Sequence, residues 1–161
     1  MTISMKVNGR DVTLEARPTD VLTDVLRDGL HLYSVKRGCD VGDCGACTVL
    51  IDGEPVNSCI YLAARADGKN IVTLEGLGDI YNMHPIQRWF METGALQCGF
   101  CGPGMILTTK ALLDKKPDAS RDEVRRALSG NLCRCTGYAK IEKAVLNAAA
   151  ELRGEEPPYA V

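Results

Sequence analysis

Eight cysteines are the residues of this 161-residue chain whose type and spacing could do chemistry. Thiolates are soft ligands for zinc, copper and iron–sulfur clusters, and cysteines in reducing compartments rarely form structural disulfides. The first 16 residues alternate polar and apolar side chains, without the apolar stretch of roughly 7–15 residues that a secretory signal requires. Metal binding is therefore the first hypothesis for these thiols, ahead of a disulfide framework, and we expect a soluble, cytoplasmic protein.

The first four cysteines form a CxxxxCxxC motif with one more cysteine after eleven intervening residues: Cys39, Cys44, Cys47 and Cys59. This is the spacing of plant-type [2Fe–2S] ferredoxins, in which four thiolates hold two tetrahedral irons bridged by sulfide. Gly38, Gly42 and Gly45 would let the backbone bend closely around a cluster and bring amide N–H groups toward its sulfurs. The spacing therefore favours a cluster over zinc at this first set.

The other four cysteines form a CxxC pair and, after a long gap, a CxC pair: Cys98, Cys101, Cys133 and Cys135. Both pairs fall at junctions between expected helices, and a bundle of helices can bring such loops together near helix N-termini, where negative charge is favoured. Paired cysteines separated by a long gap are also typical of Cys₄ structural zinc sites. At this second set, a [2Fe–2S] cluster and structural zinc both stay open on spacing alone.

The N-terminal residues predict a small α+β unit, because short apolar stretches are separated by turn dipeptides and one stretch has helical spacing. The expected elements are strands 4–7 and 11–15 around the turn Asn8-Gly9, a helix from its N-cap Thr19 to Gly29, and strands 48–51 and 71–74, with a turn at Asp52-Gly53. Residues 75–82 have turn composition and predict a linker.

Downstream of the linker, the apolar pattern is helical throughout. The expected helices are 85–94, with Trp89 and Phe90 in the core, 103–116, one begun by a capping box of Ser120 and Glu123, and 138–152. Four short helices predict a compact bundle. The expected fold class is α+β, with domains at 1–76 and 83–155 and a tail that is disordered or held by a partner.

Several function classes are excluded by composition and motif. The net charge is −2 and charges of both signs are interspersed, so no positive field would attract nucleic acid or an anionic membrane. No segment approaches the roughly 20 apolar residues that cross a bilayer. No phosphate-binding glycine motif and no nucleophile with an activating base can be assigned, so we expect no catalytic residue here. His31 and His84 are expected at the surface or in helix caps.

Three motifs together resemble the small iron–sulfur subunit of the xanthine dehydrogenase family of molybdenum hydroxylases. They are GCDVGDCGACTVLIDG from Gly38 to Gly53 with Cys59 beyond it, QCGFCGPGM from Gln97 to Met105, and GNLCRCTGY from Gly130 to Tyr138. The resemblance covers nearly the whole chain. It implies an N-terminal β-grasp, ferredoxin-like domain followed by a four-helix-bundle domain, each with one [2Fe–2S] cluster.

The resemblance also implies a role as a non-catalytic electron-transfer subunit. Electrons would pass from a molybdopterin centre on a large subunit to the helical-domain cluster, then to the ferredoxin-domain cluster, and then to FAD on a medium subunit or to another acceptor. By this resemblance Gln97 and Cys135 approach the pterin, the second cysteine set holds the proximal cluster and the first set the distal one. A freestanding two-cluster ferredoxin and a zinc-stabilised adaptor are the alternatives.

One residue departs from the family pattern. Gly102 stands where members commonly carry threonine or serine before Pro-Gly. The departure leaves all eight thiols in place but removes a hydroxyl beside the second set, so we expect a small change in local order or cluster potential. The substrate of the complex is not encoded in these motifs.

Overall fold

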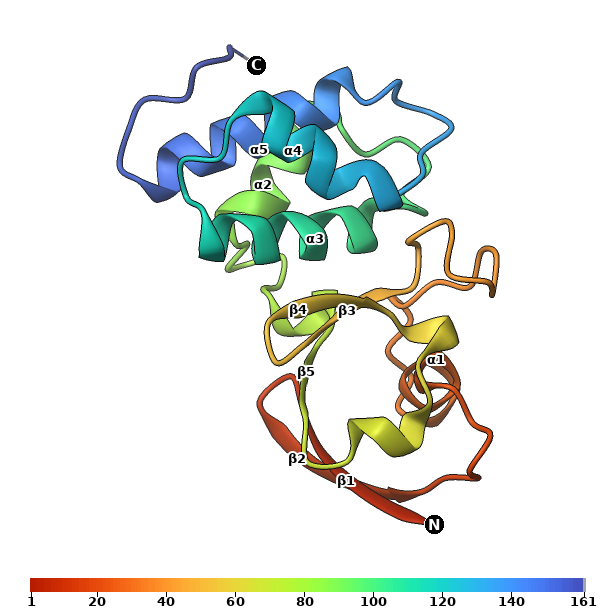
Figure 1. Cartoon of the computed structure of the whole chain (residues 1–161). Helices are drawn as coiled ribbons and strands as arrows, with labels where there is room; N and C mark the ends of the chain where they lie inside the picture. Colours follow the sequence, from red (N-terminus) through yellow and green to blue (C-terminus); the bar gives the residue numbers. More distant parts are fainter. Residues whose placement is uncertain (161) are drawn as a thin grey trace.

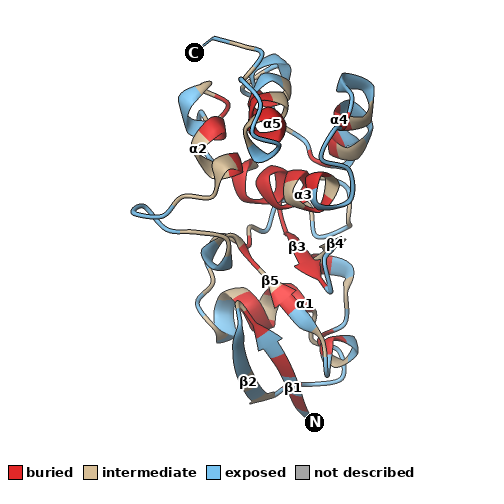
Figure 2. Cartoon of the chain, turned by 90° about the vertical axis from the view of Figure 1, so that its left-hand side faces the viewer, coloured by how far each residue is buried: buried red, intermediate tan, exposed pale blue. Residues whose placement is uncertain are grey.

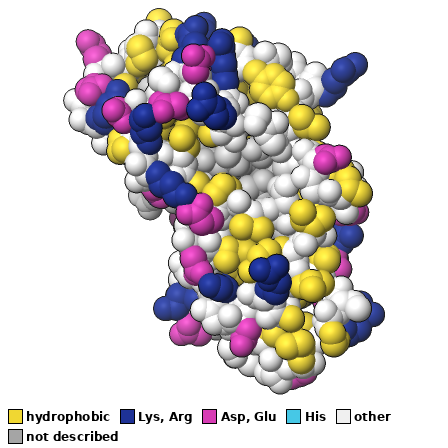
Figure 3. Space-filling model, in the orientation of Figure 1, with side chains coloured by type: hydrophobic (Ala, Val, Ile, Leu, Met, Phe, Trp, Pro, Cys, Tyr) yellow, Lys and Arg dark blue, Asp and Glu magenta, His cyan; other side chains and the backbone are white. Residues whose placement is uncertain are grey.

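The computed structural model describes residues 1–160 as a sheet-containing N-terminal half and a helical C-terminal half, stacked end to end (Figure 1). The sheet has five strands in the order β2-β1-β5-β3-β4, so the fold is α+β as expected. Within the described residues, no helix is long and apolar enough to cross a membrane. On the face shown in Figure 3, acidic and basic side chains are interspersed, in keeping with the net charge.

The predicted N-terminal hairpin is confirmed. Strand β1 (Thr2–Val7) pairs antiparallel with β2 (Arg10–Glu15) along its whole length. Asn8 and Gly9 have φ values of 50° and 79°, the two positive values that a two-residue type I′ turn requires. The hairpin therefore follows from the Asn-Gly dipeptide, and β1 begins two residues earlier than expected.

The remaining strands are β3 (Thr48–Ile51), β4 (Glu54–Asn57) and β5 (Asn70–Val72). Strand β3 is buried throughout and pairs antiparallel with β4 and β5, while β5 runs parallel to β1. Strand β5 ends before the predicted residue 74, because Leu74–Gly76 form a 3₁₀ turn. The pattern missed β4, which contains Pro55 and tolerates it as an edge strand of the sheet.

The helix expected from Thr19 begins later. Helix α1 (Leu22–Asp24) continues as a π-helical turn at Val25–Gly29, and its N-cap is Val21 rather than Thr19. The preceding residues form a separate turn, in which the Asp20 carboxylate accepts hydrogen bonds from the N–H and Nε of Arg17, both at 2.8 Å. This competing turn uses Asp20 and delays the helix.

The helical half contains α2 (Pro85–Glu92), α3 (Gly102–Lys115), α4 (Arg121–Ala127) and α5 (Ala139–Leu152), close to the predicted ranges. The capping box of Ser120 and Glu123 is present, and a second one joins His84 to Gln87 at the start of α2. Trp89 and Phe90 lie in the helical core as expected. His84 is therefore a helix cap, one of the two roles predicted for the histidines.

Helix α3 joins the two halves. Figure 2 shows α3 buried along most of its length, with β3 on one side and the other helices on the opposite side. Its residues Leu107 and Ala111 pack against Leu50 of β3 in a small buried cluster of their own. The halves therefore share an apolar contact in addition to the linker.

The described part of the C-terminal tail contacts this chain's own helices, so it is ordered here, while the expectation that a partner holds it stays a prediction. The Asn147 side chain on α5 is fully buried and bonds both the N–H and the carbonyl of Tyr159, each at 3.0 Å. Arg121 donates a hydrogen bond to the Tyr159 hydroxyl. These contacts hold the tail against α4 and α5.

Candidate metal centres

The β3–β4 hairpin brings together the two buried cysteines of the first set. Cys47 immediately precedes β3, and Cys59 lies in the 3₁₀ turn that follows β4. The strand register and a hydrogen bond of 2.7 Å from the Ser58 hydroxyl to the Cys47 carbonyl hold these ends side by side. The Cys47 and Cys59 thiols are in contact.

The other two cysteines of this set lie in the loop before β3 and also form a pair, since the Cys39 and Cys44 thiols contact each other. The loop turns back on itself through positive φ values at Asp40 (55°), Gly42 (85°) and Gly45 (70°). The structure thus brings all four predicted residues of the first set to one place, as two thiol pairs.

Backbone N–H groups point at the outer, half-buried pair. The N–H groups of Val41, Cys44 (3.4 Å) and Asp43 (3.3 Å) lower the pKa of Cys39 to about 6, because they stabilise its thiolate. At the inner pair, burial and then the adjacent Cys47 raise the pKa of Cys59 to about 12. The loop therefore already favours negative charge at its outer end, whereas a bound cation must stabilise the inner thiolate.

The second set also gathers as two pairs. Cys98 and Cys101 lie in the loop before α3, with Cys101 as the α3 N-cap, and Cys133 and Cys135 lie in the loop between α4 and α5. The Cys135 Sγ atom is 3.7 Å from Cys98 Sγ, and Cys101 contacts Cys133. Burial and Cys133 raise the pKa of Cys101 to about 12.

Two hydroxyl groups organise the CxC loop. The Thr136 hydroxyl donates to Cys133 Sγ at 3.2 Å, and although burial opposes ionisation, this bond helps to lower the pKa of Cys133. The Tyr138 hydroxyl accepts from the Cys133 N–H at 2.8 Å. A cavity of about 470 Å³ is lined by these cysteines together with Phe100, Leu132, Arg134 and Tyr138. No role for Thr136 was predicted from the sequence. Its position directly after the CxC motif was the signal that could have identified it.

The arrangement in pairs is the feature that distinguishes between metals. Within residues 1–160, no three His, Cys, Asp or Glu side chains gather closely enough to hold one metal ion. Two thiol pairs fit two sulfide-bridged irons, each taking two thiolates, whereas structural zinc takes all four sulfurs on one ion. Space is limited as well, because a Cβ on Gly38 would lie 2.9 Å from Cys44 Sγ. The donor sets therefore fit a [2Fe–2S] cluster at each position.

A main-chain hydrogen bond connects the loops that carry the two sets. The Leu132 N–H donates to the Cys44 carbonyl at 2.9 Å, and Leu132 directly precedes Cys133. A path along the chain from Cys44 to Cys133 therefore crosses a single hydrogen bond. This contact joins residues that are far apart in the sequence and no local pattern predicts it.

The remaining sequence-predicted residues lie around the second set. Gln97, Cys98 and Cys135 are exposed, which leaves this side of the set open to a partner. Gly102 is buried, and a Cβ there would lie 2.7 Å from Leu96 Cδ2. The Leu96 side chain therefore occupies the space that the first carbon of a threonine or serine at residue 102 would need.

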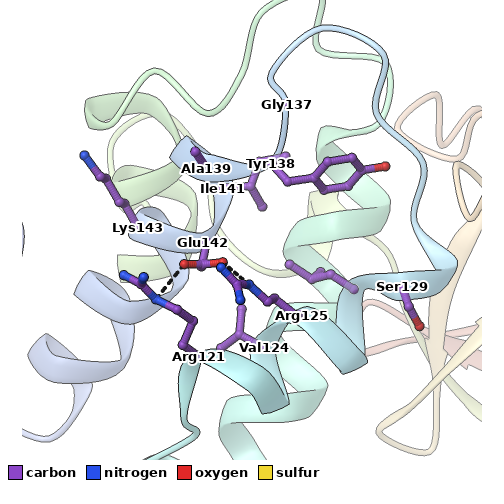
Figure 4. Close-up of a pocket in the computed structure, with 11 residues that line it drawn as sticks. Arg121, Val124, Arg125, Ser129, Gly137, Tyr138, Ala139, Ile141, Glu142 and Lys143 are labelled. Atoms are coloured by element: carbon purple, nitrogen blue, oxygen red, sulfur yellow. Dashed lines mark hydrogen bonds and ion pairs between the residues drawn. The ribbon is translucent and has the colours of Figure 1, made fainter.

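A separate hollow of about 500 Å³ lies between α4 and α5, and Figure 4 shows its lining residues. Glu142 lies there between Arg121 and Arg125, with an ion pair of 2.7 Å to each. None of the eight cysteines lines this hollow. Its lining carries three cationic side chains, Arg121, Arg125 and Lys143, and the single carboxylate of Glu142.

Comparison with known proteins agrees with both thiol sets. Residues 5–72 match a family described as a 2Fe-2S iron-sulfur cluster binding domain, and residues 73–146 match a [2Fe-2S] binding domain family. The small FeS subunit of nicotinate dehydrogenase from Eubacterium barkeri is 51% identical over 145 residues, which cover 90% of this chain and 92% of that one. The chain belongs to the iron–sulfur subunits of the molybdenum hydroxylase family. The resemblance drawn from the motifs is confirmed.

This iron–sulfur subunit is similar to a further named subunit and to chains of two solved oxidoreductase structures. The xanthine dehydrogenase iron-sulfur-binding subunit of Escherichia coli O157:H7 is 48% identical, over 91% of this chain and 93% of that one. Quinoline 2-oxidoreductase from Pseudomonas putida 86 superimposes with a TM-score of 0.91 at 46% identity, over 96% of this chain and 98% of the matched chain. Aldehyde oxidoreductase from Desulfovibrio desulfuricans ATCC 27774 gives 0.93 at 48% identity, over 96% of this chain and 17% of that chain.

Proposed function

We propose that this subunit holds two [2Fe–2S] clusters and transfers electrons between a molybdopterin centre on a large subunit and FAD or another acceptor on a partner. The observation that carries the proposal is the arrangement of eight thiols as two sets of two pairs, joined by the hydrogen bond from Leu132 to Cys44. Bound at these thiols, the clusters supply one-electron chemistry. The chain itself contributes no catalytic residue.

The proposed ligands are Cys39, Cys44, Cys47 and Cys59 for one cluster and Cys98, Cys101, Cys133 and Cys135 for the other. The N–H groups around Cys39 and the hydroxyl of Thr136 would stabilise added negative charge and so favour the reduced form. Gln97 and Cys135 are proposed to approach the partner's pterin, which is supported by their exposure beside the cavity of the second set.

The partners are proposed from the names of the relatives. Nicotinate dehydrogenase and xanthine dehydrogenase each have a chain of this kind that is named as a subunit, which supports partner subunits here. The proposed partners are a large molybdopterin subunit and a medium FAD subunit. The direction of transfer within the proposal runs from the second thiol set to the first. Eight free cysteines also support the cytoplasm as the location, because its thiols stay reduced.

The finer fold assignment belongs to the same proposal. We assign residues 1–76 to a β-grasp, ferredoxin-like domain and residues 83–155 to a four-helix-bundle domain. Two separate buried cores support this division, one built from residues 3–71 and the other from residues 86–149. The exposed residues of the linker include Tyr81, which is 87% exposed.

Single cysteine variants test the assignment of ligands to clusters. Cys59→Ser is expected to remove one S = 1/2 signal from the low-temperature EPR spectrum of the reduced protein and to leave the other signal unchanged. Cys135→Ser is expected to do the reverse, so each variant is the control for the other. Loss of the same signal in both variants would contradict the assignment.

Purification of the tagged chain from its native host tests the partners. We expect a large chain that carries molybdenum and pterin to co-purify in a fixed ratio, together with a flavin-binding chain. Two intact clusters on a chain that purifies alone would instead favour the freestanding two-cluster ferredoxin.

A further inference from the structure

We propose that Asn131 is a positioning residue that fixes the arrangement of the two thiol sets and thereby the electronic interaction between them. The inference rests on the proposed function, because it requires a cluster at each set. Asn131 lies in the loop between α4 and α5, and only 5% of it is exposed. Its main-chain N–H ends the preceding turn with a bond of 3.0 Å to the Leu128 carbonyl, which leaves the side chain available for other contacts.

The Asn131 amide connects three segments of the chain. Its Nδ2 donates to the Gly45 carbonyl at 3.1 Å and lies 3.4 Å from the Thr48 hydroxyl at the start of β3. Its Oδ1 accepts a hydrogen bond of 3.0 Å from the Thr108 hydroxyl on α3. Because a buried amide must satisfy both its donor and its acceptor, these contacts fix its position relative to both halves of the molecule.

These anchors lie next to proposed ligands. Gly45 directly follows Cys44, and Asn131 is two residues before Cys133. The same two segments meet again where the Leu132 N–H donates to the Cys44 carbonyl at 2.9 Å. One side-chain bond and one main-chain bond therefore set the register between the loops, and loss of the first leaves the second as the remaining direct bond of the two.

Two glycines allow the segments to approach this closely. A Cβ on Gly45 would lie 2.6 Å from Asn131 Nδ2 and would also meet the Gly130 carbonyl oxygen. A Cβ on Gly104 of α3 would meet the Gly45 carbonyl oxygen, well inside the 3.0 Å that real Cβ atoms keep. The close packing explains why a small, bifunctional side chain fits at residue 131.

The hydrogen bonds of Asn131 show that its proposed role differs from that of a cluster ligand. Within residues 1–160, its side-chain hydrogen bonds go to Gly45, Thr48 and Thr108, and none goes to a cysteine sulfur. Substitution of Asn131 should therefore change the interaction between the clusters while leaving the midpoint potential of each cluster close to its wild-type value.

EPR of the full chain, purified anaerobically with its clusters, measures this interaction directly. The interaction is the difference between two EPR spectra. The first is that of the protein with both clusters reduced, and the second is the sum of the spectra recorded with only one or only the other cluster reduced. We expect Asn131→Ala to reduce or broaden this difference, while both S = 1/2 signals and both midpoint potentials are retained. Thr108→Val should have the same effect in weaker form, and Thr108→Ser, which keeps the hydroxyl, should resemble the wild type.

Asn147→Ala is the matched control, because Asn147 is also a buried asparagine, and its side-chain hydrogen bonds within residues 1–160 go to the tail residue Tyr159. It should destabilise the fold without changing the interaction between the clusters. An unchanged interaction in both Asn131→Ala and Thr108→Val overturns the inference, as does an equal change in Asn147→Ala. If Asn131→Ala does not fold, the two Thr108 variants decide. A wild-type protein without two signals contradicts the proposed function itself.

Discussion

At the scale of single residues, the two thiol sets differ in what stabilises their charge. In the first set, backbone N–H groups point at Cys39, whereas in the second set a side-chain hydroxyl, that of Thr136, points at Cys133. Hydrogen bonds to a ligand sulfur stabilise the more negative, reduced form of a cluster and raise its potential. A side-chain donor can be removed by substitution, so the second set offers the cleaner test.

Thr136→Val is expected to lower the midpoint potential of one cluster only, because it removes the hydroxyl that donates to Cys133 Sγ at 3.2 Å. A hydrogen bond to a charged acceptor contributes about 1.5–3 kcal/mol, and about 1.4 kcal/mol equals roughly 59 mV for one electron, so partial loss is measurable. Redox titration followed by EPR gives both potentials. Thr136→Ser keeps the donor and should match the wild type; equal shifts in both variants would argue against the assigned role.

At the scale of elements, helix caps followed the sequence closely while helix α1 did not. Ser120 and Glu123 form the predicted capping box because the signal is local. Thr19 failed as an N-cap because Asp20 is engaged by Arg17, a competition that periodicity alone does not reveal. The contact between Leu132 and Cys44 was equally hidden, since it depends on how the two halves pack. The grouping of the eight cysteines into two sets could be predicted, because it follows from their spacing in the sequence.

His84 gives the α2 cap a dependence on pH. Burial, followed by the nearby Lys110, lowers the pKa of His84, and its Nδ1 accepts the Ile86 N–H at 3.3 Å. Because the unfolded chain binds the proton more readily, this contribution to stability is present above a pH of about 6.5 and falls as the pH drops below that value.

His84→Asn keeps a good N-cap without this titration. The difference in thermal unfolding midpoint, variant minus wild type, should therefore be larger at pH 5.5 than at pH 7.5. Thermal denaturation of both proteins at both pH values measures it. A constant difference between the two proteins would show that folding does not shift the pKa of His84, and would contradict this prediction.

At the scale of the whole molecule, helix α3 connects the hydrophobic core of the helical half to the sheet of the N-terminal half. Leu107 is 1% exposed and packs with Leu50 of β3, while Leu113 on the same helix belongs to the helical core alone. Helix α3 carries both the apolar contact between the two halves and Thr108, which bonds to Asn131. The distance between the two thiol sets therefore depends on the packing of this helix.

Leu107→Ala is expected to lower the free energy of unfolding by about 2–5 kcal/mol. Because the cavity left by the removed side chain would lie between α3 and β3, β3 should become more mobile than the other strands. Leu113→Ala is the matched control with a similar cost confined to the helical half. Hydrogen exchange of peptides that contain residues 48–51 measures the difference. Protection of β3 should fall in Leu107→Ala and persist in Leu113→Ala, and equal protection in the two variants would contradict the role given to α3.

The proposed function requires that the eight thiols hold two [2Fe–2S] clusters. The most direct measurement is iron, zinc and acid-labile sulfide content together with low-temperature EPR of the dithionite-reduced protein, purified anaerobically. We expect roughly four irons and four sulfides per chain with two distinguishable S = 1/2 signals. Stoichiometric zinc without an EPR signal would contradict it and favour a zinc-stabilised adaptor.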